Sequence, residues 1–178
     1  MTALCGLAVQ WGCDKAPAIR HGYTPFYHRL LAGRRIERVL EIGVYQGASL
    51  RMWRDYWPHA GIFGLDIDPA ALFNEGGIQT RLCDAGDAGQ LTQTAVELGG
   101  NFDLIVDDGS HRPNDQIVAV NALLPFLTPT GIYVIEDVSS PGELSARIPF
   151  PHQVHAFDSP LAKRFADDDN LIVIDKAP

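Results

Sequence analysis

The sequence lacks the features that mark several classes of protein. It has only three cysteines, Cys5, Cys13 and Cys83, an odd number without the spacing of a metal site. We therefore expect reduced thiols and a cytoplasmic protein. No run approaches the ~18 apolar residues that a membrane span needs. The first residues lack the basic start and the long apolar core of a signal peptide, so we expect none.

Basic residues are also scarce. The chain has 14 Lys and Arg against 22 Asp and Glu, a formal net charge of −8. This balance argues against a nucleic-acid partner, because binding to a phosphate backbone depends on clustered Lys and Arg. Internal repeats and linkers are missing as well. We therefore expect the 178 residues to form one domain with one core.

What the sequence does contain is an alternation of apolar β-branched runs and helical patterns. Strands are predicted at 38–44, 61–65, 78–82, 102–106, 131–135, 153–157 and 170–174. Helices are predicted at 25–31, 48–57, 91–98 and 113–127, with a helical turn near 143–147. This order predicts an α/β fold with a Rossmann-like, doubly wound sheet of about seven strands. The sheet is expected to be mostly parallel, with an antiparallel C-terminal strand.

The first predicted strand runs into the turn Glu41-Ile42-Gly43-Val44-Tyr45-Gln46-Gly47, and a helix follows. A strand, a glycine turn and a helix N-terminus favour a nucleotide-type cradle, because glycines admit a close ligand and free N–H groups point at it. A dinucleotide site needs a third glycine, which is missing. Glu41 also suits a cationic ligand better than a diphosphate. Both points argue against a nicotinamide oxidoreductase.

The second predicted strand closes on Asp66-Ile67-Asp68-Pro69. An acid about 20 residues after the glycine turn suits the two hydroxyls of a ribose. An aspartate directly before a proline is typical of a helix N-cap. We therefore assign Asp66 to the ribose and Asp68 to the cap.

Two acidic clusters close later strands: Asp107-Asp108-Gly109-Ser110-His111, and Glu136-Asp137. The carboxyl ends of parallel strands meet at one edge of a sheet, where ligands bind. Asp108, Glu136 and Asp137 would repel one another there unless a cation or a proton compensates them. This favours a hard divalent metal beside a general base. The alternative is a pair of ordinary strand-end acids that cap the following turns.

With these residues in hand, the chain resembles the class I S-adenosylmethionine-dependent methyltransferases, on the Glu41-x-Gly43-x-x-x-Gly47 turn and Asp66. It resembles more specifically the metal-dependent sugar O-methyltransferases of macrolide and related antibiotic biosynthesis. The segments that carry this second resemblance are Asp14-Lys15, His21, Tyr23, 39–45, 50–53, 66–69, 107–113 and 135–137.

The resemblance implies a methyltransferase that uses S-adenosylmethionine and Mg²⁺ on a hydroxyl of a sugar or other vicinal diol in a natural product. It implies that Mg²⁺ is held by Asp108, Glu136 and Asp137 and that His111 is the general base. The alternative for His111 is a helix N-terminal residue merely hydrogen-bonded to Asp108. The residues implied for the cofactor are Glu41, Gly43, Gly47, Asp66, Asp84, Asp107 and Tyr23.

The sequence also suggests how the chain is divided. Residues 1–35 are expected to be an N-terminal arm or lid, or simply a docking segment. Residues 36–137 are expected to form the cofactor-binding βα core, and 138–178 a shortened C-terminal part. In that last part, Asp167-Asp168-Asp169 is expected to be a solvated turn, because the alternating ligands of a calcium loop are missing.

The sequence departs from the family pattern in three places. Only residues 138–152 separate the fifth and sixth strands, Cys13 stands where threonine is usual, and Ala85 stands where glutamine often follows Asp84. The cofactor and metal positions are kept, whereas the parts that cover the acceptor are reduced. A catechol-like or other small acceptor, or a non-catalytic cofactor-binding subunit, are therefore the alternatives. A homo-oligomer could also complete the acceptor site.

Overall fold

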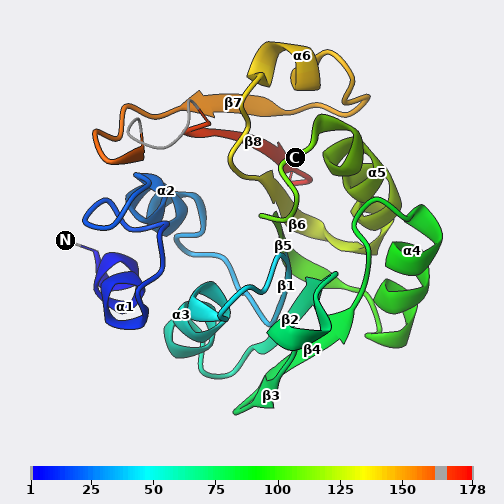
Figure 1. Cartoon of the computed structure of the whole chain (residues 1–178), viewed down its shortest axis with the longest axis horizontal. Helices are drawn as coiled ribbons and strands as arrows, with labels where there is room; N and C mark the ends of the chain where they lie inside the picture. Colours follow the sequence, from blue (N-terminus) through cyan, green and yellow to red (C-terminus); the bar gives the residue numbers. More distant parts are fainter. Residues whose placement is uncertain (1, 163–167, 178) are drawn as a thin grey trace.

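The computed structural model describes residues 2–162 and 168–177. Within these ranges, one sheet of eight strands has the order β3-β4-β2-β1-β5-β6-β8-β7, with helices on both faces (Figure 1). The strands are β1 (Arg38–Ile42), β2 (Gly61–Asp66), β3 (Asn74–Glu75), β4 (Ile78–Leu82), β5 (Phe102–Asp107), β6 (Leu127–Ile135), β7 (Gln153–Ala156) and β8 (Asn170–Asp175). The α-helices are α1 (Ala3–Trp11), α2 (Tyr23–Leu30), α3 (Ala48–Tyr56), α4 (Ala88–Glu97), α5 (Pro113–Leu123) and α6 (Pro141–Ser145). Two short 3₁₀ turns are η1 (Pro69–Ala71) and η2 (Leu124–Phe126).

The sheet confirms the predicted Rossmann-like fold. Strands β4, β2, β1, β5 and β6 pair in parallel, and β8 runs antiparallel between β6 and β7. The chain moves outward from β1 in one direction and returns to add β5 on its other side. This reversal between β1 and β5 is the topological switch point at which α/β sheets bind ligands. The sequence did not predict β3, which has only two residues, or α1, whose apolar residues show no clear period.

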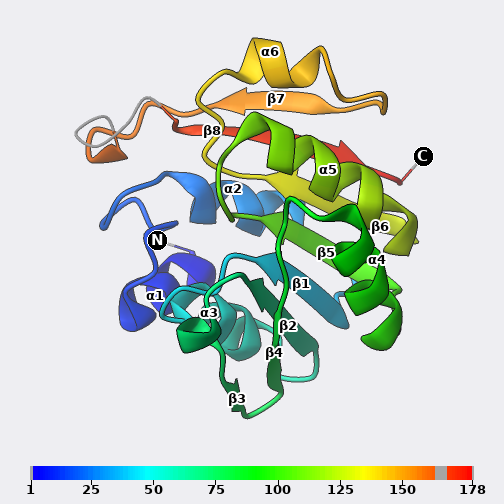
Figure 2. The same cartoon turned by 45° about the vertical axis from the view of Figure 1, so that its right-hand side comes forward.

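Alternate residues of each strand face opposite layers. Val39 of β1 packs in a core with Trp53 of α3, and helices α1 and α2 contribute to the same core. The next residue, Leu40, packs in a second core with Leu91 of α4 and Val120 of α5. Figure 2 shows the two helical layers on either side of the sheet. Both faces of the central strands are covered, which explains why these strands read as continuous apolar runs.

The irregular N-terminal segment belongs to one of these layers. Helix α1 lies beside α3, and the Trp11 indole N–H donates a hydrogen bond to Asp55 Oδ2 at 2.8 Å. None of the helices in the two described ranges is long and apolar enough to cross a membrane.

The predicted solvated turn before β8 is wrong for the aspartates that can be described. Asp167 lies outside the described residues. Asp169 is buried, accepts the Ser159 N–H at 2.8 Å and lies 3.0 Å from His21 Nδ1. These partners replace the water that a carboxylate needs. The sequence could not show this because the partners come from distant segments.

We expect Gly64→Ala to destabilise the fold. A Cβ at Gly64 would lie 2.7 Å from Leu50 Cδ1 and 2.8 Å from Val44 Cγ2, in the core between β2 and α3. Overpacking of this kind costs about 1–3 kcal/mol. Urea unfolding would measure the loss, with Gly142→Ala as the matched control, because a Cβ there meets nothing within 4 Å. Equal unfolding free energies for the two variants would contradict this account of the core.

Candidate functional site

The predicted acidic clusters meet at the carboxyl edge of the sheet. In the register of the parallel strands, Ile42, Asp107 and Ile135 lie side by side. The ladder continues one step further, since Asp108 N donates to Ile42 O and Glu136 N donates to Asp107 O, each at 2.9 Å. The glycine turn and both clusters are therefore neighbours, as the sequence predicted.

Two of the predicted glycines are required by the backbone. Gly43 has φ +94°, and a Cβ there would lie 2.1 Å from the carbonyl oxygen of Asp108. Gly47 precedes α3 with φ +74°, and a Cβ there would lie 2.5 Å from the Phe73 ring. Glycine is the residue that adopts this conformation without strain. These positions let the turn after β1 lie directly against the end of β5.

Asp66 shapes the same turn. Its carboxylate accepts the N–H groups of Val44 and Tyr45 at 2.8 and 3.0 Å, and that of Asp68 at 2.9 Å. Burial raises the pKa of Asp66, but the backbone N–H groups lower it further, and the net pKa lies below the usual range. Asp68 caps the following 3₁₀ turn through the Ala70 N–H at 2.8 Å. This confirms the predicted cap.

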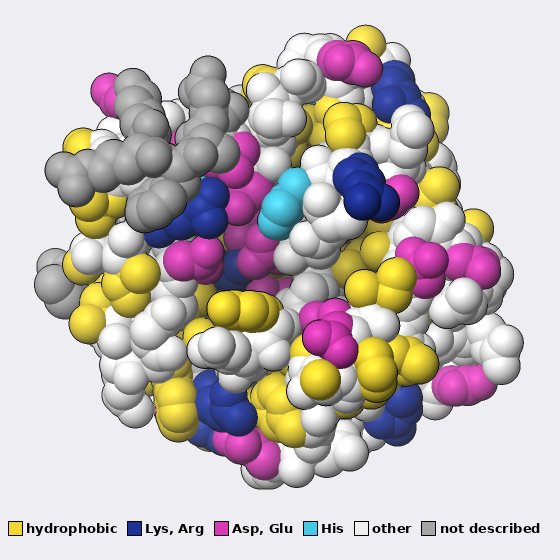
Figure 3. Space-filling view, in the orientation of Figure 1, with side chains coloured by type: hydrophobic (Ala, Val, Ile, Leu, Met, Phe, Trp, Pro, Cys, Tyr) yellow, Lys and Arg dark blue, Asp and Glu magenta, His cyan; other side chains and the backbone are white. Residues whose placement is uncertain are grey.

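Two adjoining cavities, of ≈720 Å³ and ≈550 Å³, open at this edge and share Gly43, Asp66 and Gly109. The predicted site residues that line the larger cavity are Gly43, Asp66, Asp108, His111 and Asp137. Those that line the smaller one are Gly43, Asp66 and Asp84. Figure 3 shows acidic side chains gathered in a hollow of this face, beside a histidine. The larger cavity is therefore strongly acidic.

The other predicted site residues lie close to this edge without lining either cavity. Among the described residues, the two cavity walls do not include Glu41, Gly47, Asp107, Tyr23 or Glu136. All of these are buried. The structure thus brings the whole predicted set to one edge but exposes only part of it to a ligand.

One acidic group at the end of the larger cavity could hold a metal ion. Ligand atoms of Asp108, His111 and Asp137 all lie within 4.8 Å of one another. Asp137 Oδ1 also accepts a hydrogen bond from Tyr23 Oη at 2.8 Å. Burial raises the pKa of Asp137, which is the expected behaviour of a carboxylate with too little compensating positive charge.

The backbone at this group is strained. In the described part of the chain, four non-glycine residues have positive φ, and three of them line the larger cavity: Tyr45, His111 and Asp137. Such conformations cost free energy and cluster at functional sites. His111 Nδ1 is buried without a hydrogen-bond partner among the described residues. That atom is therefore available to a ligand.

Glu136 has different neighbours from Asp137, although the two are adjacent in sequence. Its Oε2 lies 2.8 Å from Lys15 Nζ, and its Oε1 accepts a hydrogen bond from the Tyr27 hydroxyl. Burial raises the pKa of Glu136 well above its usual range. Glu136 is not part of the group formed by Asp108, His111 and Asp137, so its role as a metal ligand stays a prediction.

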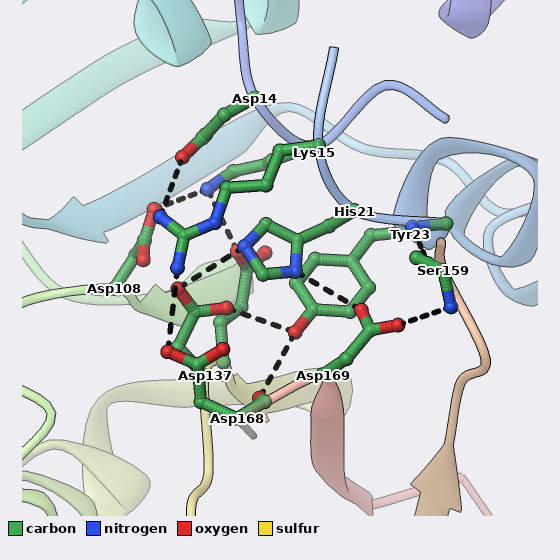
Figure 4. A network of polar contacts seen from close by, with 12 residues as sticks. Asp14, Lys15, His21, Tyr23, Asp108, Asp137, Ser159, Asp168 and Asp169 are labelled. Carbon is green, nitrogen blue, oxygen red and sulfur yellow. Dashed lines mark hydrogen bonds and ion pairs between the residues drawn. The ribbon is translucent and has the colours of Figure 1, made fainter. Parts of the chain in front are cut away.

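Lys15 is the site residue that the sequence did not identify. Its side chain is 1% exposed, and its ammonium lies 3.3 Å from Glu41 Oε1 and 2.8 Å from Glu136 Oε2. The ammonium also contacts Asp108 Oδ2 (Figure 4). Glu41 is held further by the Trp53 indole N–H at 2.6 Å. Lys15 lies in a stretch without periodicity, so no local pattern indicated its burial. Only the family resemblance at Asp14-Lys15 pointed to this position, and it implied no role.

His21 completes the set of buried partners from the N-terminal segment. Its Nδ1 lies 3.0 Å from Asp169 Oδ1 and its Nε2 lies 3.5 Å from Asp137 Oδ2 (Figure 4). The imidazole stacks on the Tyr23 ring, with 4.6 Å between centroids. Asp137 therefore has two neighbours from the N-terminal segment, one on each carboxylate oxygen.

Comparison with known proteins gives a consistent result. A protein-family model described as a methyltransferase domain matches residues 40–138. Demethylmacrocin O-methyltransferase of Streptomyces fradiae is 42% identical over 127 residues, which cover 66% of this chain and 32% of that protein. A second relative, from Streptomyces olivaceus, is named as the 3'-O-methyltransferase of a methoxyrhamnosyl tetracenomycin-C derivative. It is 40% identical over 141 residues, which cover 74% of this chain and 36% of that protein.

A solved structure agrees with these relatives. It is MycE, a methyltransferase from the mycinamycin biosynthetic pathway, in complex with Mg, SAH and mycinamycin VI. It is 36% identical, with a TM-score of 0.71 over 78% of this chain and 40% of that one. The chain thus spans about a third to two fifths of the length of these three relatives.

The buried acids predict a pH dependence of stability. Burial raises the pKa of Asp107 to about 7, above the ~3.9 of an unfolded aspartate. The folded state then binds the proton more tightly, so this contribution to stability is complete below about pH 3.9 and is lost as pH rises through about 7.

In a chelating buffer, we expect the unfolding free energy of the wild type to fall between pH 5 and 8, and Asp107→Asn to reduce that fall by roughly 1–4 kcal/mol. Asn keeps an oxygen that can accept the Tyr133 hydroxyl hydrogen bond, which is 3.4 Å long in the native protein. Asp175→Asn, at the opposite end of the sheet, is the control. Identical pH slopes in wild type and Asp107→Asn would contradict the prediction.

Proposed function

This chain belongs to the methyltransferase domain family, and we propose that it is an S-adenosylmethionine- and Mg²⁺-dependent O-methyltransferase. Its acceptor is a hydroxyl of a sugar or other vicinal diol in a natural product. By their names, one of the relatives above methylates demethylmacrocin and the other a rhamnosyl derivative of tetracenomycin C. Identities of 36–42% over most of this chain support the transfer of that activity class.

The observation that carries the proposal is the pair of adjoining cavities at the switch point. S-adenosylmethionine has an adenosine part and a charged amino-acid part, joined at a sulfonium. The smaller cavity, with Asp84, suits the adenine, and the shared Asp66 suits the ribose hydroxyls. The lining of the larger cavity is acidic as a whole, which suits the cationic ammonium and sulfonium groups. Glu41, Asp107 and Tyr23 are buried behind the residues that line the two cavities, and they would act on the cofactor from there.

The N-terminal segment supports the proposal that residues 1–35 form a lid. The residues of this segment that line the larger cavity, together with the glycine turn, are Trp11, Gly12, Cys13, Asp14 and Arg20. In this arrangement, residues 36–137 form the cofactor-binding core and 138–178 its C-terminal edge. The segment between β6 and β7 contains only the short helix α6, which leaves room for a large glycosylated acceptor.

The donor set of the larger cavity fits a hard divalent ion. Asp108 and Asp137 offer carboxylate oxygens, the ligands that Mg²⁺ prefers, within 4.8 Å of each other and of His111. Glu136 would be the third ligand, as the family resemblance implies. When bound, Mg²⁺ would lower the pKa of an acceptor hydroxyl, and the sulfonium would supply the electrophilic methyl group.

His111 would then act as the general base. Its strained backbone aims the imidazole at the same group of atoms as Asp108 and Asp137, and its buried Nδ1 is free to accept a proton. Asp137, held by Tyr23, keeps the acceptor side of the cavity negatively charged. General-base assistance of this kind is typically worth about 10²–10⁴ in rate.

We expect S-adenosylmethionine to raise the melting temperature and NAD to leave it unchanged. Asp66→Asn should weaken S-adenosylmethionine binding on the order of tenfold, because a charged acceptor for the ribose hydroxyls is lost. Isothermal titration calorimetry would measure this, with Asp175→Asn as the control. Binding of neither ligand, or of NAD alone, would contradict the proposed cofactor.

We further expect His111→Ala to bind S-adenosylmethionine like the wild type and to lose about 10²–10⁴ in turnover. Methyl transfer from labelled cofactor to a panel of macrolide glycosides and catechols would measure turnover. A chelator should abolish it, and Mg²⁺ should restore it. His59→Ala, an exposed position far in sequence from the clusters, is the control. Full activity of His111→Ala would rule out the base, and transfer that resists chelation would rule out the metal.

A further inference from the structure

Lys15 holds an unusual position, because one buried ammonium contacts the carboxylates of three neighbouring strands. Glu41 lies in β1, Asp108 follows β5 and Glu136 follows β6. The side chains of Lys15, Glu41 and Glu136 are at most 1% exposed, whereas that of Asp108 is 21% exposed. Lys15 itself comes from the segment between α1 and α2. It therefore connects the N-terminal segment to the carboxyl edge of the sheet.

These contacts tie the two halves of the proposed site together. Glu41 is fixed by Trp53 of α3, the helix that begins at the glycine turn. Asp108 and Glu136 belong to the set proposed to hold Mg²⁺. A cation that shares its contacts among all three fixes the carboxylates of Asp108 and Glu136 relative to the glycine turn. A buried charge that lost this partner would be strongly destabilising.

The same contacts oppose a second cation. Lys15 occupies one carboxylate oxygen of Asp108 and one of Glu136, and its positive charge would repel a divalent ion held by the same carboxylates. Both effects weaken metal binding. They do so while keeping the two ligands in a fixed orientation.

We propose that Lys15 is a positioning residue that orients Asp108 and Glu136 and keeps divalent-metal binding at this edge weak and reversible. This inference rests on the proposed function, because it assigns the roles of Lys15 relative to the metal ligands of that proposal. It predicts that the loss of the ammonium tightens metal binding and slows turnover. A residue with a merely structural role would not tighten metal binding.

The test is Lys15→Met, which keeps an unbranched side chain only one heavy atom shorter and removes the charge. Mn²⁺ binding is measured by electron paramagnetic resonance, and thermal melting is followed with Mn²⁺ and with a chelator. We expect the Mn²⁺ Kd to fall on the order of tenfold. We also expect a larger rise in melting temperature on adding Mn²⁺ than in the wild type, and a lower kcat. Lys176→Met is the matched control, since Lys176 contacts only backbone carbonyls of Leu124 and Leu127 among the described residues.

A second variant separates the effect of net charge on metal binding from the effect of Lys15 on the orientation of Asp108 and Glu136. Lys15→Met combined with Glu41→Gln removes one positive and one negative charge, and the glutamine can still accept the Trp53 indole N–H. If Lys15→Met alone does not fold, the double variant is measured in its place. We expect its Mn²⁺ affinity to return toward the wild-type value and its kcat to stay low, because the orientation of Asp108 and Glu136 is not restored.

The outcomes distinguish this inference from the proposed function. A wild type that binds neither Mn²⁺ nor S-adenosylmethionine contradicts the proposed function itself. A wild type that binds both, with unchanged or weaker Mn²⁺ binding in Lys15→Met, overturns only the role of Lys15. Recovery of both affinity and kcat in the double variant would overturn the positioning role.

Discussion

The arrangement of the site depends on how closely the turn after β1 approaches the end of β5. A Cβ at Gly43 would lie 2.1 Å from the Asp108 carbonyl oxygen, so any other residue would force the two strands apart. The close approach lets Gly43 border both cavities. It also places the first acid of the predicted metal cluster directly beside the cofactor loop. In the proposed methyl transfer, the methyl donor and the activated hydroxyl must meet within a few ångströms, and this contact would set the distance between their sites.

The second constraint is the concentration of negative charge. Glu41, Asp108, Glu136 and Asp137 end up at one edge because the register of a parallel sheet leaves them no alternative. Two groups of side chains compensate this negative charge. Lys15 and the Tyr27 hydroxyl contact Glu136. Tyr23 and His21 contact Asp137, whose positive φ turns it toward the cavity. Two consecutive acids thereby acquire different surroundings.

The sequence predicted the features that follow from hydrophobic periodicity and from the positions at which the strands end. The apolar runs located the parallel strands, and the glycine turn and the acids after β5 and β6 followed from the rule that parallel strands end together. It did not predict which of Glu136 and Asp137 faces the cavity, since this depends on a backbone dihedral at Asp137. It also did not predict a contact between Trp53 and Glu41. The indole N–H is a hydrogen-bond donor as well, and it keeps Glu41 buried.

The compensating side chains have a consequence for how such a site can be inherited. Residues 40–138, which the family model matches, contain all four carboxylates. The lysine, the histidine and both tyrosines that contact them precede residue 40. Recombination that joined this core to a foreign N-terminal segment would transfer the acids without their counter-charges. The unit that can be exchanged between proteins is therefore the sheet edge together with its N-terminal segment, and substitutions in that segment can retune the site while the motifs stay unchanged.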